Sequence, residues 1–561
     1  MKSYEEWSKA RKQAQLAGNI PDWYTTQGYQ MFHSGYALPG EGDVKQRFKT
    51  IADTLAKYTN TPAYWNAVFF QILWKGWFSP ATPVLTNTGN SRGMPVSCAG
   101  QYIDDSIEAF YSNLAEAASL CKQGFGCSAT VDPIRPRGSD FASDGKANGP
   151  WHVIEDLASM AQKVSQGSSR RGSIASYINI ESPDFWEIAD KIQDDPSKVH
   201  IGWVVEQSFI DQLQANDREM DDRFKKAIYL RLVYGRGYFF FKDKANKLRP
   251  LMYQELGLEI NNSNLCTEIM LFNDMMHTFS CILGSVNAAK YDEWKDTNLI
   301  QYATVFMDCV VSYFLDKSKN IPGMEKVRRF TEKGRAIGIG VVGLSEYLIK
   351  NRIPFDSIEA LSFNNKLFRE LNEKSLIASK KLALELGEPE WCKGHGVRHT
   401  HRTAVAPTKS TSTLMGNTSE SVFPYPGIAY DISSAKGEMP IVVGEFYRLA
   451  KERGMWSTEL ATDIVNHLGS VQHLDWLTDH EKLVFRTAFE LDQHVLIRYA
   501  SNRQKYLCQG QSLNFYIRDG HTGQYVAELH KAAFLNPNIL SLYYIHSQNG
   551  VVIEACQNCA A

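Results

Sequence analysis

A single cysteine with polar neighbours is the first feature of this chain that could do chemistry. In the segment NNSNLCTEIM (261–270), Asn264 stands two residues before Cys266 and Glu268 stands two residues after it. If the segment is extended, the three side chains share one face, because side chains alternate along a strand. One wall would then carry an amide, a sulfur and a carboxylate. The alternative is a buried cysteine that packs as a small hydrophobe, but its polar neighbours would still need partners or a ligand.

The composition is that of a globular protein and excludes some functions. Of the 561 residues, 43% are hydrophobic and 22% are charged. The 60 basic and 62 acidic residues leave a net charge of −2, which argues against binding to nucleic acid or to an acidic membrane. The N-terminal MKSYEEWSKARKQ lacks the apolar core of a signal peptide, and no apolar run is long enough to span a bilayer. We therefore expect a cytoplasmic protein.

The ten cysteines are spread thinly, which suits a reducing compartment. One close pair, Cys556 and Cys559, forms a C-x-x-C motif in the terminal EACQNCAA. The motif could be half of a zinc site, but no second half lies elsewhere in the sequence. A redox dithiol is the better interpretation, because a pair at the end of a chain can move between two partners. An independent thiol oxidoreductase is disfavoured, since no β-α-β context surrounds the motif.

The pattern of apolar residues predicts an α/β protein in three parts. We expect a helical region over 1–75, a catalytic α/β domain over 76–545 and a redox-active tail over 546–561. Helical patterns lie at 107–123, 152–166, 205–214, 222–234, 292–318, 324–350 and 357–386. Strand-like runs lie at 237–241, 280–287, 403–408, 511–517 and 540–546. Their alternation favours a buried, largely parallel sheet or barrel.

Several motifs occur together in one order. They are SCAG with Cys98, NLCTEI with Cys266, SC with Cys281 followed by SVN, RAIGIGVVGLSEYLI (335–349), APTKSTS (406–412), QSLN (511–514), YY (543–544) and the terminal C-x-x-C. With these motifs the chain closely resembles the large, catalytic subunit of ribonucleotide reductase over roughly residues 60–561. The resemblance implies a ten-stranded α/β barrel with a finger loop that carries Cys266, and a helical N-terminal portion.

The resemblance also implies a radical mechanism. Cys266 would remove the 3′ hydrogen of the ribose as a thiyl radical, Glu268 would act as the general base on the 3′-hydroxyl, and Asn264 would hold the same region by hydrogen bonds. Cys98 and Cys281 would supply two electrons and close to a disulfide. Cys556 and Cys559 would then reduce this disulfide, and thioredoxin or glutaredoxin would regenerate the tail.

Nucleotide contacts follow from the same resemblance. The substrate phosphates are assigned to hydroxyl side chains, namely Thr82, Ser97, Thr408, Ser410, Thr411 and Ser412. Lys409 stands where many relatives have a small or acidic residue. A nucleoside triphosphate effector is assigned to Asp105, Ser106, Ile107 and Arg135, and a loop between the two nucleotides to Gln166, Arg170 and Arg171. The alternative for these segments is a helix cap and a basic loop.

The radical source is expected to lie in another chain. The sequence shows no glycyl-radical motif and no metal cluster, so the chain is expected to hold no metal or other cofactor. Tyr543 and Tyr544 match the pair that, in class I enzymes, passes the radical from a dimetal small subunit. Two other functions stay open, an adenosylcobalamin-dependent class II reductase and an inactive nucleotide-binding regulatory paralogue. We also expect a homodimer, and no N-terminal ATP cone, because Cys98 comes so early in the chain.

Overall fold

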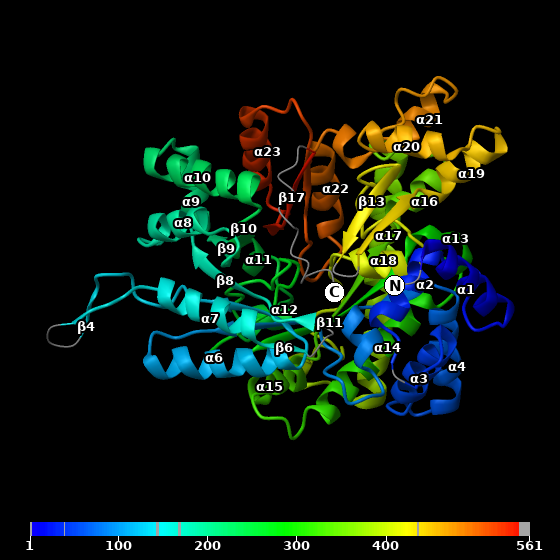
Figure 1. The fold of residues 1–561 in the computed structure, drawn as a ribbon. Coiled ribbons are helices and arrows are strands. Elements are labelled where there is room, and N and C mark those ends of the chain that lie inside the picture. Colours follow the sequence, from blue (N-terminus) through cyan, green and yellow to red (C-terminus); the bar gives the residue numbers. More distant parts are fainter. Residues whose placement is uncertain (1–2, 39, 142–144, 167–169, 435–436, 549–561) are drawn as a thin grey trace.

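The computed structural model describes residues 3–38, 40–141, 145–166, 170–434 and 437–548. Its first part is helical, with α1 (Tyr4–Leu16), α2 (Thr26–Gly35), α3 (Val44–Ala56) and α4 (Pro62–Trp74), drawn in blue in Figure 1. Local chemistry explains α3. The side chain of Asp43 accepts a hydrogen bond from the Gln46 backbone N–H at 3.2 Å and caps the helix, while Phe48, Ile51 and Leu55 bury one face.

A nine-stranded sheet forms the centre of the molecule. Its strands are β1 (Phe78–Pro80), β2 (Cys98–Tyr102), β3 (Gly126–Thr130), β8 (Ile174–Asn179), β9 (His200–Val205), β10 (Tyr238–Phe241), β11 (Phe279–Asn287), β12 (Ile337–Val342) and β16 (Ser541–Leu542). Strands β2, β3, β8, β9 and β10 are parallel to their neighbours in that order, and β11 is parallel to β12. The β2–β11 and β10–β16 pairs are antiparallel. The parallel group from β2 to β10 therefore runs opposite to the parallel pair β11–β12.

Two short extended segments close this sheet into a barrel. Ile339 of β12 bridges to Thr403, and Val405 bridges to Gln511. The backbone N–H of Tyr543, next to β16, donates to the carbonyl of Leu513 at 2.8 Å. Together with β2, β3, β8–β12 and β16, these segments make a ring of ten in the described part of the chain. The ten-stranded α/β barrel implied by the resemblance is confirmed.

Helices cover the outside of the barrel. They are α5 (Thr82–Asn87), α6 (Ile107–Lys122), α7 (Trp151–Lys163), α8 (Phe185–Asp194), α9 (Gln207–Gln214), α10 (Arg218–Tyr234), α11 (Lys242–Lys247), α12 (Leu251–Glu255), α13 (Tyr291–Trp294), α14 (Leu299–Lys317), α15 (Glu325–Gly334), α16 (Leu344–Lys350), α17 (Ile358–Leu386), α18 (Lys409–Leu414), α22 (His494–Gln504) and α23 (Gly523–Leu535). Helices α6 and α7 lie side by side at the lower left of Figure 1. Each buries its apolar stripe against the molecule, as amphipathic helices do.

Smaller elements complete the fold. Short pairs are β4 (Asp140–Phe141) with β5 (Gly145–Lys146), β6 (Ser165–Gln166) with β7 (Arg170–Arg171), β13 (Ala429–Ser434) with β14 (Gly437–Val442), and β15 (Phe515–Ile517) with β17 (Ile545–Ser547). Helices α19 (Gly444–Glu452), α20 (Thr458–Asn466) and α21 (Asp479–Val484) stand at the upper right of Figure 1. Three single 3-10 turns lie at Ala288–Lys290, Glu390–Cys392 and Ala488–Glu490.

Two predicted helices are wrong in extent. The helix expected over 292–318 is interrupted at 295–298, between α13 and α14. The pattern over 324–350 predicted a single helix, but the structure has α15, then β12, then α16. The reason is the segment IGIGVV, in which a Cβ on Gly340 would lie 2.5 Å from the Ala404 carbonyl oxygen. Gly340 lets the Ala404 backbone approach closely, and Gly338 leaves room for the Leu283 side chain. Glycine with β-branched residues favours a strand over a helix interior. Strands β3, β8 and β9 were also absent from the predicted runs.

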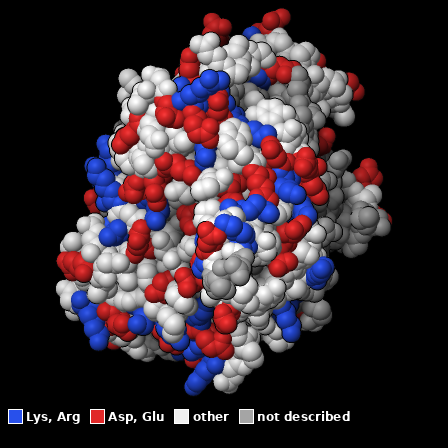
Figure 2. Space-filling view, turned by 90° about the vertical axis from the view of Figure 1, so that its left-hand side faces the viewer, with Lys and Arg blue, Asp and Glu red and all other residues white. Residues whose placement is uncertain are grey.

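Charge and hydropathy agree with an ordinary folded surface and core. On the face formed by the left-hand side of Figure 1, basic and acidic side chains are interspersed (Figure 2). Within the described residues, α14 is the one helix long and apolar enough to cross a membrane, and 67% of its apolar window is buried inside the protein. Its apolar residues Phe306, Val310 and Phe314 belong to the main core.

Candidate active site

Cys266 lies in a buried loop rather than on a strand. Residues 261–273 contain neither helix nor strand, and Thr267 has a φ of 69°, in the left-handed region that a β-branched residue rarely adopts. The shared strand face expected for Asn264, Cys266 and Glu268 is therefore wrong. The turn at Thr267 interrupts the alternation on which that expectation depended. The loop nevertheless carries all three side chains into the barrel, where each is at most 8% exposed.

Barrel segments hold this loop in place. The Ser541 hydroxyl donates to the Thr267 carbonyl oxygen at 2.8 Å. The Ser512 hydroxyl lies 2.6 Å from the Cys266 carbonyl oxygen and 3.0 Å from Glu268 Oε2. On the other side, the Tyr177 hydroxyl donates to the Asn264 carbonyl oxygen at 2.5 Å. Several hydrogen bonds from the barrel therefore hold this turn, and such bonds allow a strained backbone conformation to persist.

The environment of Glu268 suits a general base. Burial raises the pKa of Glu268 to about 7, although hydrogen bonds from the backbone, Asn264 and Ser512 act in the lowering direction. A carboxylate with this pKa can accept a proton near neutral pH and also release it again. The pKa of Glu268 therefore suits a group that takes up and releases a proton beside Cys266.

Cys98 and Cys281 face each other across two strands. They are opposite partners in the antiparallel β2–β11 ladder, although 183 positions separate them in the sequence. Opposite partners have Cα atoms roughly 4.5–5.5 Å apart, within the range of about 4.4–6.8 Å that a disulfide needs. Neither is part of a disulfide in the structure, and burial raises the pKa of Cys281 to about 12. The pair can close to a disulfide without a change of strand register.

The redox pair also contacts the loop. The Asn264 side-chain amide donates to Cys98 Sγ at 3.2 Å. Gln509 donates from its amide to Cys281 Sγ at 3.5 Å and to the Ile337 carbonyl oxygen at 3.1 Å. One enclosed site therefore brings together the lone cysteine, the carboxylate and the dithiol.

Two tyrosines extend from Cys266 toward the outside. The Tyr543 hydroxyl lies 3.5 Å from Cys266 Sγ, and the Tyr543 and Tyr544 rings have centroids 3.8 Å apart. Tyr543 is 2% exposed, whereas Tyr544 is only partly buried. The three groups form a short continuous path from the site.

The predicted phosphate-binding residues lie in three places along the chain. Thr408 stands directly before α18, its hydroxyl accepts from the Ser421 backbone N–H at 2.7 Å, and Ser410, Thr411 and Ser412 lie in the helix. Thr82 begins α5 and hydrogen-bonds the Tyr36 hydroxyl at 2.8 Å. The buried Ser97 hydroxyl, next to Cys98, has no hydrogen-bond partner among the described residues, which fits a group that meets a ligand.

The predicted effector residues cluster at the start of α6. Ser106 caps this helix by accepting from the Ala109 backbone N–H at 3.2 Å, so the capping interpretation is correct for this side chain. Asp105 and Arg135 form an ion pair at 2.5 Å, and Ile107 is 62% exposed. Gln166 in β6 donates to the Asn87 side chain at 3.2 Å.

Some predicted residues cannot be placed in the site. Arg170 and Arg171 pair with Gln166 and Ser165 through their backbones, but their side chains lie outside the described part. Cys556 and Cys559 also lie outside the described residues.

Comparison with known proteins decides the family. Residues 96–219, 204–392 and 389–545 match the ribonucleotide reductase barrel domain, and residues 22–93 match the ribonucleotide reductase all-alpha domain. The chain belongs to the ribonucleotide reductase large-subunit family. It is 32% identical over 499 residues to a putative ribonucleoside-diphosphate reductase large subunit of Frog virus 3, covering 85% of this chain and 86% of that protein.

Two further relatives of this reductase subunit extend the comparison. A large subunit from Invertebrate iridescent virus 3 is 26% identical, with 94% of each chain covered. The structure resembles the class Id alpha subunit of Actinobacillus ureae with a TM-score of 0.87 and 34% identity, covering 95% of this chain and 99% of that one. The structural likeness is thus to a class I enzyme.

Sequence reasoning missed several residues of this reductase site. Tyr238 of β10 has its ring centroid 5.1 Å from that of Tyr543 and 5.8 Å from that of Tyr544. Gln509 contacts the dithiol, and Ser512 contacts the loop. Ser512 stands within the motif QSLN, so that signal was available, but nothing local marks Gln509 or Tyr238.

Proposed function

We propose that this chain is the catalytic subunit of a class I ribonucleoside-diphosphate reductase, which converts ribonucleoside diphosphates to 2′-deoxyribonucleoside diphosphates. One observation carries the proposal. The loop bearing Cys266 and Glu268 donates from Asn264 to Cys98, which stands opposite Cys281 in the ladder. Hydrogen abstraction, proton transfer and two-electron reduction could therefore act on one sugar.

The proposed steps balance in atoms and electrons. The sulfur radical of Cys266 takes the 3′ hydrogen, and Glu268 takes the 3′-hydroxyl proton. The 2′-hydroxyl then leaves as water with a proton from the dithiol. The second hydrogen of the dithiol goes to the 2′ carbon in place of the lost hydroxyl, so Cys98 and Cys281 lose two electrons in total and join as a disulfide. Glu268 returns its proton to the 3′ oxygen. Cys266 returns its hydrogen to the 3′ carbon and is again a sulfur radical. The pKa of about 7 for Glu268 supports both directions of proton transfer.

Reducing equivalents would come through the tail. Cys98 is 5% exposed and Cys281 is fully buried, so a protein reductant cannot reach their disulfide directly. We infer that Cys556 and Cys559 exchange with it and are reduced in turn by thioredoxin or glutaredoxin.

The radical would arrive from a small subunit that holds two metal ions. The contact from Tyr543 to Cys266 and the close Tyr544 ring support a relay through these phenols. Such a relay favours class I over the adenosylcobalamin-dependent alternative. The small subunit is accordingly proposed as an essential partner.

We further propose nucleotide regulation of substrate choice. Asp105, Ser106, Ile107 and Arg135 would bind a nucleoside triphosphate, while the hydroxyls before and within α18 bind the substrate phosphates. A homodimer is the proposed assembly. None of the eight cysteines that the structure describes is part of a disulfide, which supports a cytoplasmic location.

The first test replaces the lone cysteine. Cys266→Ser is expected to abolish deoxyribonucleotide formation with a small subunit and leave nucleotide binding near normal, because a hydroxyl cannot take the place of the sulfur radical. Cys309→Ser, in the buried core of α14, is the matched control and should retain activity. Substantial product from Cys266→Ser would contradict the proposal.

A second test separates the two radical sources. Tyr543→Phe and Tyr544→Phe are each expected to stop turnover without unfolding, since the relay needs a phenol O–H. Tyr506→Phe, a partly buried tyrosine elsewhere, serves as the control. Full activity in both relay variants, with product made only when adenosylcobalamin is supplied, would assign the enzyme to class II instead.

A further inference from the structure

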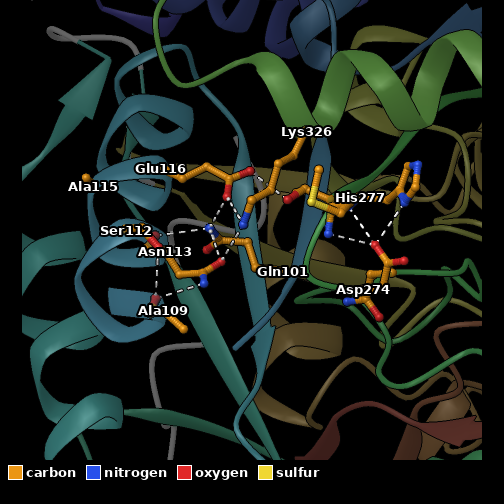
Figure 3. Close-up of polar contacts among 12 residues, drawn as sticks. Gln101, Ala109, Ser112, Asn113, Ala115, Glu116, Asp274, His277 and Lys326 are labelled. Carbon is orange, nitrogen blue, oxygen red and sulfur yellow. Dashed lines mark hydrogen bonds and ion pairs between the residues drawn. The ribbon is translucent and has the colours of Figure 1, made fainter. Parts of the chain in front are cut away.

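A buried carboxylate links α6 to the ladder that holds the redox pair. Glu116 lies in the middle of α6 and is only 7% exposed. Its Oε2 accepts from the Gln101 side-chain amide at 3.0 Å, and its Oε1 accepts from the Thr278 hydroxyl at 2.6 Å. Lys326 of α15 supplies the counter-charge at 3.4 Å. Figure 3 shows Glu116, Gln101 and Lys326 pointing toward one another.

Of the residues that Glu116 contacts, Gln101 lies on β2 and Thr278 lies directly before β11. Gln101 comes three residues after Cys98, and Thr278 comes three residues before Cys281. The ladder ends at the Phe279–Gly100 pair, and the next residues in the same register are Thr278 and Gln101. Opposite residues project to the same face, and an odd separation reverses the face. Glu116 therefore contacts the outer face of the β2–β11 ladder, and Cys98 and Cys281 lie on the inner face of the same ladder.

The contacts of Asn113 strengthen this connection. The Gln101 amide also donates to the Asn113 carbonyl oxygen at 3.0 Å, so one strand side chain holds two successive turns of α6. Asn113 in turn donates from its side chain to the Ala109 carbonyl oxygen at 2.9 Å (Figure 3). A network of charge-assisted bonds in a buried setting is stiff, because each lost partner leaves a desolvated polar group.

The N-terminal end of the same helix carries the proposed effector residues. Ser106 caps α6 and adjoins Asp105, which pairs with Arg135. Ten residues of helix, about 15 Å at 1.5 Å per residue, separate this cap from Glu116. A helix is rigid over this length, so a displacement at the cap is passed to the carboxylate.

We propose that Glu116 is a positioning residue that transmits effector binding from the start of α6 to the spacing of Cys98 and Cys281, and so sets how readily this dithiol closes. The inference rests on the proposed function. It concerns the outer side of β2 and β11, a different route from the loop at Gln166.

The test measures the thiol–disulfide equilibrium of the pair. The full-length chain with Cys556→Ser and Cys559→Ser is equilibrated in dithiothreitol buffers, with and without ATP or dTTP. Differential alkylation and mass spectrometry then give the fraction of the Cys98–Cys281 disulfide. We expect at least one nucleotide to change the equilibrium constant about fivefold, within the usual range of coupling between sites. In Glu116→Gln the change should fall below about twofold.

Two further variants make the outcome decisive. Glu108→Gln, on an exposed position of the same helix, should keep the full effector response. Thr278→Val removes only the hydrogen bond from Glu116 to the residue before β11, and it should reduce the response even if Glu116→Gln fails to fold. An unchanged response in Thr278→Val, or no response in the parent, would overturn the inference.

A turnover assay of the wild-type chain with a small subunit distinguishes failure of the Glu116 inference from failure of the proposed function. Absence of product would overturn the proposed function itself. Normal product formation together with unaltered effector responses in Glu116→Gln and Thr278→Val would overturn only the role of Glu116.

Discussion

At the scale of single residues, Glu268 combines a functional need with a cost in stability. Burial raises its pKa from 4.5 to about 7. Between pH 4.5 and pH 7 the carboxyl group is therefore protonated in the folded protein and ionised in the unfolded chain. Stability should therefore fall as pH rises from about 4.5 to 7, by on the order of 3 kcal/mol. We expect Glu268→Gln to remove this slope in urea unfolding and to cut turnover at least about 100-fold. The wild-type kcat/KM should rise with an apparent pKa near 7. A flat wild-type profile would contradict the assignment of Glu268 as base.

At the scale of elements, the loop over 261–273 depends on the barrel segments that contact it. The hydrogen bond from Ser512 acts to lower the pKa of Glu268. Ser512→Ala should therefore move the acid limb of the pH–rate profile to higher pH and reduce activity at neutral pH. Ser541→Ala is the control, because it removes a bond to the Thr267 carbonyl oxygen without touching Glu268. If both variants shift the limb equally, general loosening of the loop is responsible and the specific role of Ser512 is wrong.

At the scale of the whole molecule, the buried dithiol must exchange with a part of the chain that can reach the outside. We expect Cys556→Ser with Cys559→Ser to block turnover driven by thioredoxin. A pre-reduced sample should still form about one product per chain, since Cys98 and Cys281 hold one pair of electrons. Rapid quenching and product counting test this, with the wild-type chain as the comparison. Continued turnover in the double variant would show that thioredoxin reaches the inner pair by another route.

Local pattern in the sequence was enough to predict much of the helical structure. The helices over 107–122 and 358–386 agree with their predicted ranges to within a residue. Ser106 and Ser357 cap them, which is information contained in neighbouring residues. The ordered motifs around Cys98, Cys266 and Cys281 likewise placed the chain in its family. Local pattern failed at 324–350, where the close approach of Gly340 to Ala404 decides for a strand.

Long-range pairing decided the rest of the site. Cys98 stands opposite Cys281 because β2 and β11 pair in one register, and barrel closure sets that register across distant segments. The turn at Thr267 is held by hydrogen bonds from the Ser512, Ser541 and Tyr177 hydroxyls to carbonyl oxygens of the loop. These partners are distant in the sequence, so no local propensity could have predicted the turn. The chain's residues therefore determined which groups are present and which helices form. Only the tertiary structure decided which groups meet, because contacts between distant segments depend on packing and not on sequence proximity.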